Sequence, residues 1–232
     1  MCRCFRHVTS IVENFELYNS TIFVYGTELT RLMCIKEPEK CANVFSVVSD
    51  VVIAYEMNLM KDNVKALSGQ EEILYGWISV NDYFEKLENT RSSGARFGGI
   101  DFKNYSVLLS FEGDTPIVIP DKFQNSTQTI LYSNKFTVHG VDFMCYGVRQ
   151  MYNRVLLTLI QKSTWWSAIN HPCLQKSYSE SIESSSLFSP CVPRPDFSFK
   201  KSYAVNGGWD EGECLKLIQE TIKNIDDKQD ML

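Results

Sequence analysis

The first seven residues hold the densest group of reactive side chains in the sequence. Cys2 and Cys4 are two residues apart, and His7 follows three residues later. A second cysteine and histidine, His171 and Cys173, also lie two residues apart. Zinc prefers thiolate and imidazole ligands, so the chain could be a zinc-stabilised regulatory module. Its four ligands would be Cys2, Cys4, His171 and Cys173. The paired C-x-x-C knuckles of typical zinc sites are missing, however, so we expect no metal or cofactor.

The same N-terminal cysteines suit a lipid anchor. S-palmitoylation of Cys2 and Cys4 would add two acyl chains, which suffice for stable attachment to a membrane. Arg3 and Arg6 would favour an anionic leaflet. Peripheral membrane tethering through the two cysteines is therefore an open alternative.

One short motif indicates phosphodiester chemistry. His7-Val8-Thr9 resembles one half of the paired His-x-Thr/Ser signature of the 2H phosphoesterases. That resemblance implies a phosphodiesterase or nuclease in which two histidines act as acid and base while hydroxyl groups hold the phosphate. The second histidine would be His139, although Gly140 and Val141 follow it in place of the second motif. An enzyme that uses His7, Thr9 and His139 is the alternative function.

Two adjacent tryptophans, Trp165 and Trp166, follow a predicted helix. Neighbouring side chains on a helix point in different directions, so we expect at least one indole to be exposed. Large aromatic side chains anchor many protein interfaces. The pair therefore predicts a protein partner. Because the sequence holds no complete acid–base set, we predict a non-enzymatic protein that binds another macromolecule.

Composition and charge narrow the choice of partner and compartment. The formal net charge of −5 argues against a protein that coats nucleic acid, because phosphate neutralisation dominates that kind of binding. No stretch approaches the roughly 20 apolar residues that a membrane span needs. With no secretory leader in view, we expect the eight cysteines to be reduced and the protein to be cytoplasmic. Scarce alanine beside abundant asparagine and tyrosine is typical of AT-rich genomes, which favours a viral accessory or host-interaction protein.

The hydrophobic pattern predicts an α+β fold. We expect residues 1–232 to form a single globular domain, with a central, mostly antiparallel sheet and helices at the N- and C-terminal ends. The strands fall mainly between residues 96 and 148, where the short spacings favour antiparallel pairing.

The flanking elements are set by apolar periodicity and by helix caps. The pattern predicts helices over 38–60, with a strand over 47–54 left open, and over 149–162, where the apolar stripe should pack onto the central sheet. Asp210 and Glu213 resemble a capping box that opens the last helix. The other expected segments are a strand over 72–80, a Ser/Pro-rich loop over 176–195 and an acidic tail over 226–232.

Overall fold

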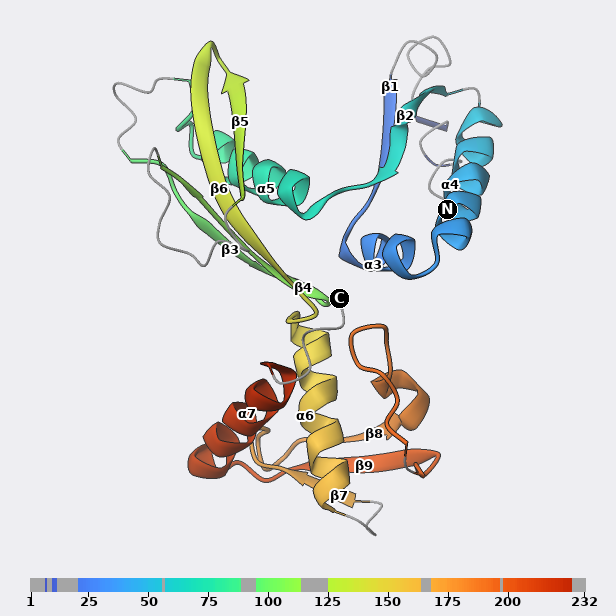
Figure 1. The fold of residues 1–232 in the computed structure, drawn as a ribbon, viewed down its shortest axis with the longest axis vertical. Helices are drawn as coiled ribbons and strands as arrows, with labels where there is room; N and C mark the ends of the chain where they lie inside the picture. Colours follow the sequence, from blue (N-terminus) through green and yellow to red (C-terminus); the bar gives the residue numbers. More distant parts are fainter. Residues whose placement is uncertain are drawn as a thin grey trace. The chain divides into compact units, whose positions relative to one another are not determined.

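The chain folds as two compact units, which are described separately. The first comprises Met1–Asp101 and Val107–Phe143, and the second comprises Phe102–Ser106 and Met144–Leu232. The computed structural model describes residues 7, 10, 11, 21–55, 57–88, 95–113, 125–163, 168–196 and 198–226 (Figure 1). The α+β class is confirmed, with the described strands distributed over three sheets. The single domain that we expected stays a prediction.

A small parallel sheet and two helices begin the first unit. Its strands pair side by side, and their inner face packs on the second helix through Ile22, Val24, Val52, Met57 and Leu59. Pro38 occupies the first turn of that helix, where a backbone N–H would make no hydrogen bond within the helix, so its absence costs nothing. The predicted helix is confirmed over 38–53 but not over 58–60, which begin the second strand, and the strand alternative over 47–54 is wrong. The elements are β1 (Thr21–Gly26), α3 (Glu28–Lys36), α4 (Pro38–Ile53) and β2 (Asn58–Ala66).

A four-stranded sheet covered by one helix completes the first unit. The strand order is β3-β4-β6-β5, and helix α5 lies along one face of the sheet (Figure 1). Trp77 of the helix packs on Phe136 of the sheet, with ring centroids 5.6 Å apart, at the centre of the core. The elements are α5 (Gly69–Tyr83), β3 (Gly99–Phe102), β4 (Ser106–Glu112), β5 (Asn125–Leu131) and β6 (Asn134–Met144).

Helix α5 corrects the strand that the sequence predicted over residues 72–80. The apolar run fits a strand by composition, but Ile73 and Trp77 are four residues apart and face the same core. Ser68 caps the helix: its hydroxyl accepts from the Glu71 amide, and the Glu71 carboxylate accepts from the Ser68 amide. This capping box satisfies two amide donors at the helix start and decides the local structure.

The second unit packs two helices against a three-stranded sheet. Strand β9 lies between β7, to which it is parallel, and β8, to which it is antiparallel. Helix α6 contacts β7, η2 and α7, so its apolar stripe packs within this unit. Its predicted packing on the central sheet stays a prediction. The elements are α6 (Val148–Lys162), β7 (Ala168–His171), β8 (Ser179–Glu183), the 3-10 helix η2 (Ser184–Leu187), β9 (Ser202–Gly207) and α7 (Glu211–Asp226).

Two segments of the second unit differ from the expected loop and tail. The predicted loop over 176–195 contains both β8 and η2, because backbone pairing with β9 orders its first half. Helix α7 begins as predicted, with the Asp210 carboxylate accepting from the Glu213 amide. It continues to Asp226, and the rest of the predicted acidic tail lies outside the described residues. No helix in the described ranges is both long and apolar enough to cross a membrane.

Leu156 tests the core of the second unit, because its side chain on α6 is 1% exposed. Leu156→Ala should lower the free energy of unfolding by about 2–5 kcal/mol, since it removes buried contacts and leaves a cavity. Chemical denaturation measures this. Val148→Ala on the same helix is the control, because Val148 is 57% exposed and its change should stay within about 0.5 kcal/mol. Equal midpoints for the two variants would contradict the packing.

Candidate functional site

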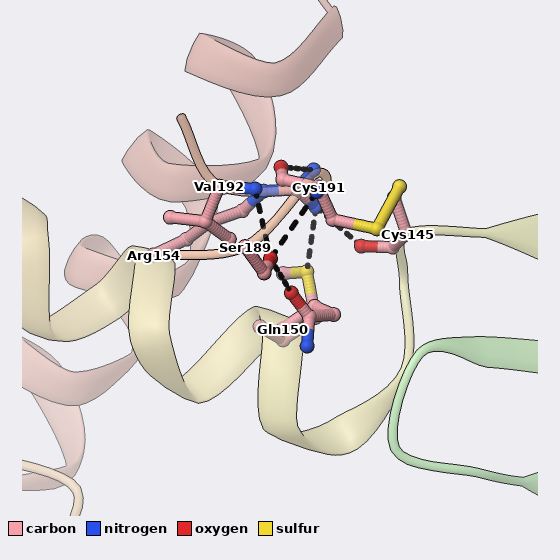
Figure 2. The surroundings of a disulfide bond; sticks show 7 residues. Cys145, Gln150, Arg154, Ser189, Cys191 and Val192 are labelled. Carbon is pink, nitrogen blue, oxygen red and sulfur yellow. Dashed lines mark hydrogen bonds between the residues drawn. A yellow bond between two sulfur atoms is a disulfide. The ribbon is translucent and has the colours of Figure 1, made fainter. Parts of the chain in front are cut away.

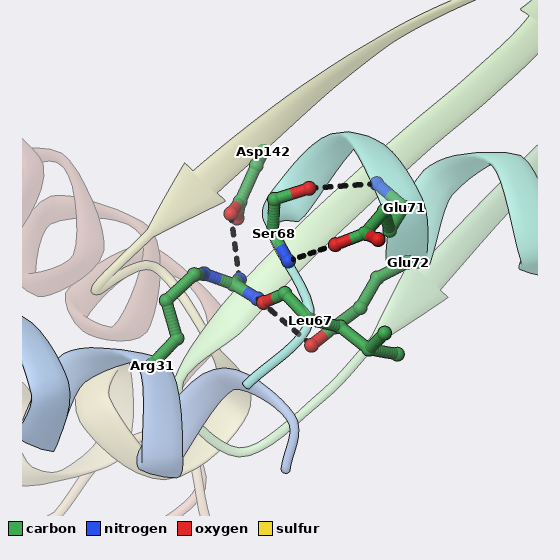
Figure 3. Close-up of polar contacts among 6 residues, drawn as sticks. All are labelled: Arg31, Leu67, Ser68, Glu71, Glu72 and Asp142. Atoms are coloured by element: carbon green, nitrogen blue, oxygen red, sulfur yellow. Dashed lines mark hydrogen bonds and ion pairs between the residues drawn. The ribbon is translucent and has the colours of Figure 1, made fainter. Parts of the chain in front are cut away.

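One guanidinium is shared by a buried and a half-buried carboxylate in the first unit (Figure 3). Arg31 of α3 donates from Nη1 to Glu72 Oε1 at 2.8 Å and from Nη2 to Asp142 Oδ2 at 2.7 Å. Its Nη1 also donates to the carbonyl of Leu67 at 2.9 Å. The side chains of Arg31, Glu72 and Asp142 are 12%, 2% and 16% exposed. We call these three residues the Arg31 cluster.

The capping box of α5 places Glu72 in this cluster. Ser68 and Glu71 fix the first turn of the helix, and Glu72 is the next residue along the chain. A carboxylate in the first turn is favoured by the partial positive charge at a helix N-terminus. The Glu71 carboxylate is engaged elsewhere, because it pairs with Lys65 as well as with the Ser68 amide. The contact with Lys65 lowers the pKa of Glu71. Of the two adjacent glutamates, Glu72 is therefore the one whose carboxylate is buried against Arg31.

Two glycines allow helix α5 to lie close to strand β6 beside the Arg31 cluster. A Cβ at Gly69 would overlap the carboxylate of Asp142, lying 2.9 Å from its Cβ and 3.0 Å from its Cγ. Gly140, two residues earlier on β6, faces Ile73 of α5, where a Cβ would lie 3.1 Å from Cδ1. Side chains at these positions would push the helix away from the strand. The close approach of α5 to β6 thus depends on the absence of both side chains.

A disulfide and a buried leucine fix the helix that carries Arg31. Cys34, one turn beyond Arg31, is bonded to Cys41 of α4. Leu32, next to Arg31, is fully buried. Helix α3 is therefore held by a covalent bond on one side and by the Arg31 cluster on the other.

The chemistry of the cluster follows from its composition. Carboxylates can accept a proton from water during hydrolysis, and a guanidinium can stabilise anionic oxygen atoms. Low solvent exposure strengthens each of these electrostatic effects. The cluster is therefore our candidate active site.

A second ordered polar group surrounds a disulfide in the second unit (Figure 2). Arg154 of α6 donates to the carbonyls of both bonded cysteines, Cys145 at 2.6 Å and Cys191 at 2.9 Å. Burial lowers the pKa of Arg154. Ser189 donates to Gln150 Oε1 and accepts from the Cys191 amide at 3.2 Å. These contacts fasten the segment around Cys191 to α6, which is a structural role.

His171 forms a third polar group, at the end of β7. Its ring stacks on Tyr152, with centroids 5.8 Å apart, and its Nδ1 accepts from the Cys173 amide at 3.2 Å. The residue is 2% exposed, and burial lowers the pKa of the imidazole. The Tyr152 hydroxyl donates to Glu180, and burial together with this contact raises the pKa of Tyr152. The group is packed inside the unit.

The disulfides rule out the alternative zinc site as drawn, and the prediction of reduced cysteines is wrong for the described residues. Cys173 is bonded to Cys214, so it cannot offer a thiolate to a metal. Six of the eight cysteines form disulfides. Within the described ranges, no group of His, Cys, Asp and Glu has the arrangement of a metal site. Cys2 and Cys4, the expected zinc ligands and lipidation sites, lie outside the described residues.

Of the residues predicted to act in a phosphodiesterase or in partner binding, the structure describes only the two histidines, His7 and His139. His139 of β6 is half-buried: its Nε2 lies 2.8 Å from the Gly113 carbonyl, and its ring stacks on Phe111. His7 is exposed, and its carbonyl accepts from the Ser10 hydroxyl. Thr9, Trp165 and Trp166 lie outside the described residues. The protein partner expected at the two tryptophans therefore stays a prediction.

Sequence reasoning missed all three members of the Arg31 cluster. Arg31 and Asp142 are 111 residues apart in the chain, and no short motif contains either of them. The available signal was the Ser68–Glu71 capping box, which would have placed Glu72 in the first turn of a helix.

Comparisons with known proteins identify relatives along almost the whole chain. The model of the GDA1/CD39 (nucleoside phosphatase) family matches residues 3–230. Ectonucleoside triphosphate diphosphohydrolase 8 of Bos taurus is 26% identical over 94% of this chain and 44% of that protein. Ectonucleoside triphosphate diphosphohydrolase 1 of Mus musculus is 24% identical over 97% of this chain and 45% of that protein. The chain thus spans a little less than half the length of these relatives.

A solved structure shares the fold. Nucleoside triphosphate hydrolases from Neospora caninum align with a TM-score of 0.55 at 12% identity, covering 78% of this chain and 35% of that one. The family match and the sequence relatives overturn the prediction of a non-enzymatic binding protein of viral accessory type. That prediction was wrong because it rested on amino-acid composition and on the lack of short catalytic motifs, and neither of these excludes an enzyme.

His171 generates a prediction about acid stability. Burial lowers the pKa of the folded imidazole below its ordinary value of 6.5, so the unfolded chain binds a proton more readily. The stability that the neutral imidazole contributes is present in full above about pH 6.5 and declines as the pH falls toward the folded pKa. His171→Gln should remove this component and flatten the dependence of the unfolding free energy on pH. Denaturation at several pH values measures it, and identical slopes would contradict the buried neutral form.

The Cys145–Cys191 disulfide generates a second prediction. It closes a loop with a sequence separation of 46, so replacing both cysteines by serine should lower the free energy of unfolding by about 4 kcal/mol. The same change at Cys34 and Cys41, separated by 7 residues, should cost about 2.5 kcal/mol. Urea denaturation of both variants checks the order, and a larger loss for the short loop would refute it.

Proposed function

We propose that this chain, which belongs to the GDA1/CD39 (nucleoside phosphatase) family, hydrolyses the terminal phosphate of nucleoside phosphates. The names of its relatives support nucleoside triphosphates and diphosphates as the substrate class. The family match over residues 3–230 is the observation that carries the proposal. The chain spans less than half of the relatives' length, so its own turnover has to be measured.

The Arg31 cluster supplies the groups that such a reaction needs. Water would attack the terminal phosphorus and lose a proton to a carboxylate of Glu72 or Asp142. The bond between phosphorus and the bridging oxygen would break, releasing inorganic phosphate and leaving the electron pair on the shortened nucleotide. A carboxylate that removes the proton during attack contributes typically 10²–10⁴-fold to a rate.

The surroundings of the cluster also suit an anionic substrate. The N-terminal turn of α5 carries partial positive charge. This charge would offset part of the negative charge of a phosphate group that approaches the two carboxylates. The helix start beside the carboxylates is the geometric support for the proposal.

The disulfides support an oxidising compartment for this activity. Disulfides persist in secreted and extracytoplasmic proteins and are rare in the reducing cytosol. The described part of the chain contains three of them. We therefore propose maturation outside the cytosol, in place of the cytoplasmic location that the sequence suggested.

The two carboxylates give the test of the proposed function. Oxidised full-length protein should release inorganic phosphate from a nucleoside triphosphate supplied with magnesium. Glu72→Gln and Asp142→Asn should each lower kcat by about 10²-fold or more, because an amide cannot accept the proton. Glu37→Gln is the matched control, since that carboxylate is 56% exposed and pairs only with nearby Lys40 among the contacts described.

Two results would overturn the proposed function. One is a wild-type protein that neither binds a nucleoside triphosphate in calorimetry nor releases phosphate from it. The other is a wild-type activity that survives both Glu72→Gln and Asp142→Asn, which would place the chemistry elsewhere.

A further inference from the structure

We propose that Arg31 is a positioning residue that holds the carboxylates of Glu72 and Asp142 in the arrangement needed for hydrolysis. The inference rests on the proposed function and concerns the same site. Arg31 acts through its two partners and need not touch the substrate.

The geometry of the guanidinium supports this role. Two different nitrogen atoms serve the two carboxylates, Nη1 for Glu72 and Nη2 for Asp142 (Figure 3). A planar guanidinium fixes the angle between these two directions. The additional bond from Nη1 to the Leu67 carbonyl, 2.9 Å long, fixes the plane itself. The two carboxylates are thereby set relative to each other and to the start of α5.

Arg31 joins two regions that are far apart in the sequence, the start of α5 and the end of β6. Leu67 lies just before α5, and Glu72 lies in its first turn. Asp142 lies near the end of β6, and Arg31 lies on α3. Helix α3 is itself fixed by the Cys34–Cys41 disulfide. Because its helix is fixed, Arg31 can hold the two carboxylates in defined positions. An arginine on a mobile helix could not do this.

A lysine could not replace Arg31 in this role. An ammonium group is a compact charge without the fixed fork of a guanidinium. Arg31→Lys would preserve the positive charge while releasing at least one of the two carboxylates. Comparing Lys with Arg at this position thus separates charge from geometry.

Gly69 offers an independent way to disturb the same geometry without touching a charged group. A Cβ at this position would overlap the Asp142 carboxylate, so Gly69→Ala should move Asp142 away from Arg31 Nη2. Gly76 is a matched control on the same helix, because a Cβ there would meet nothing within 4 Å. The two substitutions add the same methyl group to α5.

The experiment measures kcat and KM for phosphate release by the wild type and by four variants of the full oxidised chain. Misplacement of reacting groups by about 1 Å can reduce a rate 10²-fold, so Arg31→Lys, Arg31→Ala and Gly69→Ala should each lose about that factor in kcat. KM should change less than about threefold, because a positioning residue acts on the reacting groups. Gly76→Ala should match the wild type.

Chemical rescue separates positioning from a purely structural ion pair. Free methylguanidinium should restore part of the lost kcat of Arg31→Ala, by about tenfold or more, while methylammonium should not. Circular dichroism establishes that each variant is folded. If Arg31→Ala does not fold, the comparison of Gly69→Ala with Gly76→Ala decides the question.

The outcomes keep the two proposals apart. A wild type without phosphate release refutes the proposed function. An active wild type whose kcat is unchanged in folded Arg31→Lys, or in Gly69→Ala, refutes the positioning role alone. A loss that falls on KM instead of kcat, with no rescue by methylguanidinium, also refutes it.

Discussion

The first unit depends on sharing one guanidinium between a buried carboxylate, Glu72, and a half-buried one, Asp142. Removing charges from water is unfavourable, and a buried charge that loses its partner destabilises a protein by several kcal/mol. Arg31, Glu72 and Asp142 must therefore stay together, and in doing so they tie α3, α5 and β6 to one another. The neighbouring features serve this requirement: Gly69 gives Asp142 room, and the Cys34–Cys41 disulfide steadies α3. Stability and the proposed chemistry thus rest on the same contacts.

The second unit is held together differently. Its sheet has three short strands, and two disulfides, Cys145–Cys191 and Cys173–Cys214, tie distant segments to each other. Arg154 reinforces the first of these bonds by donating to the carbonyls of both cysteines. The unit should therefore fold reliably only where disulfides can form, which agrees with the proposed oxidising compartment.

Local patterns predicted much of the fold but little of the site. Helices α6 and α7 follow from apolar periodicity and from the cap at Asp210, because those signals lie within one or two turns. Helix α5 was mistaken for a strand, because a short apolar run fits both structures and the deciding cap at Ser68 lies before it. The cluster joins residues separated by 41 and 111 positions, so only the tertiary fold brings them together. The disulfides were missed because the compartment was misjudged, and cysteine spacing alone does not give pairing.

The claim that the cluster works as one unit has a direct test in a double-mutant cycle on kcat. Phosphate release would be measured for the wild type, Arg31→Ala, Asp142→Asn and the double variant under identical conditions. If Arg31 acts by holding both carboxylates, the part of its effect that runs through Asp142 is already lost in Asp142→Asn, so the combined loss should fall short of the product of the single losses, with a coupling of about 1–3 kcal/mol. Effects that multiply in the double variant would show that the two residues act independently and would contradict the account.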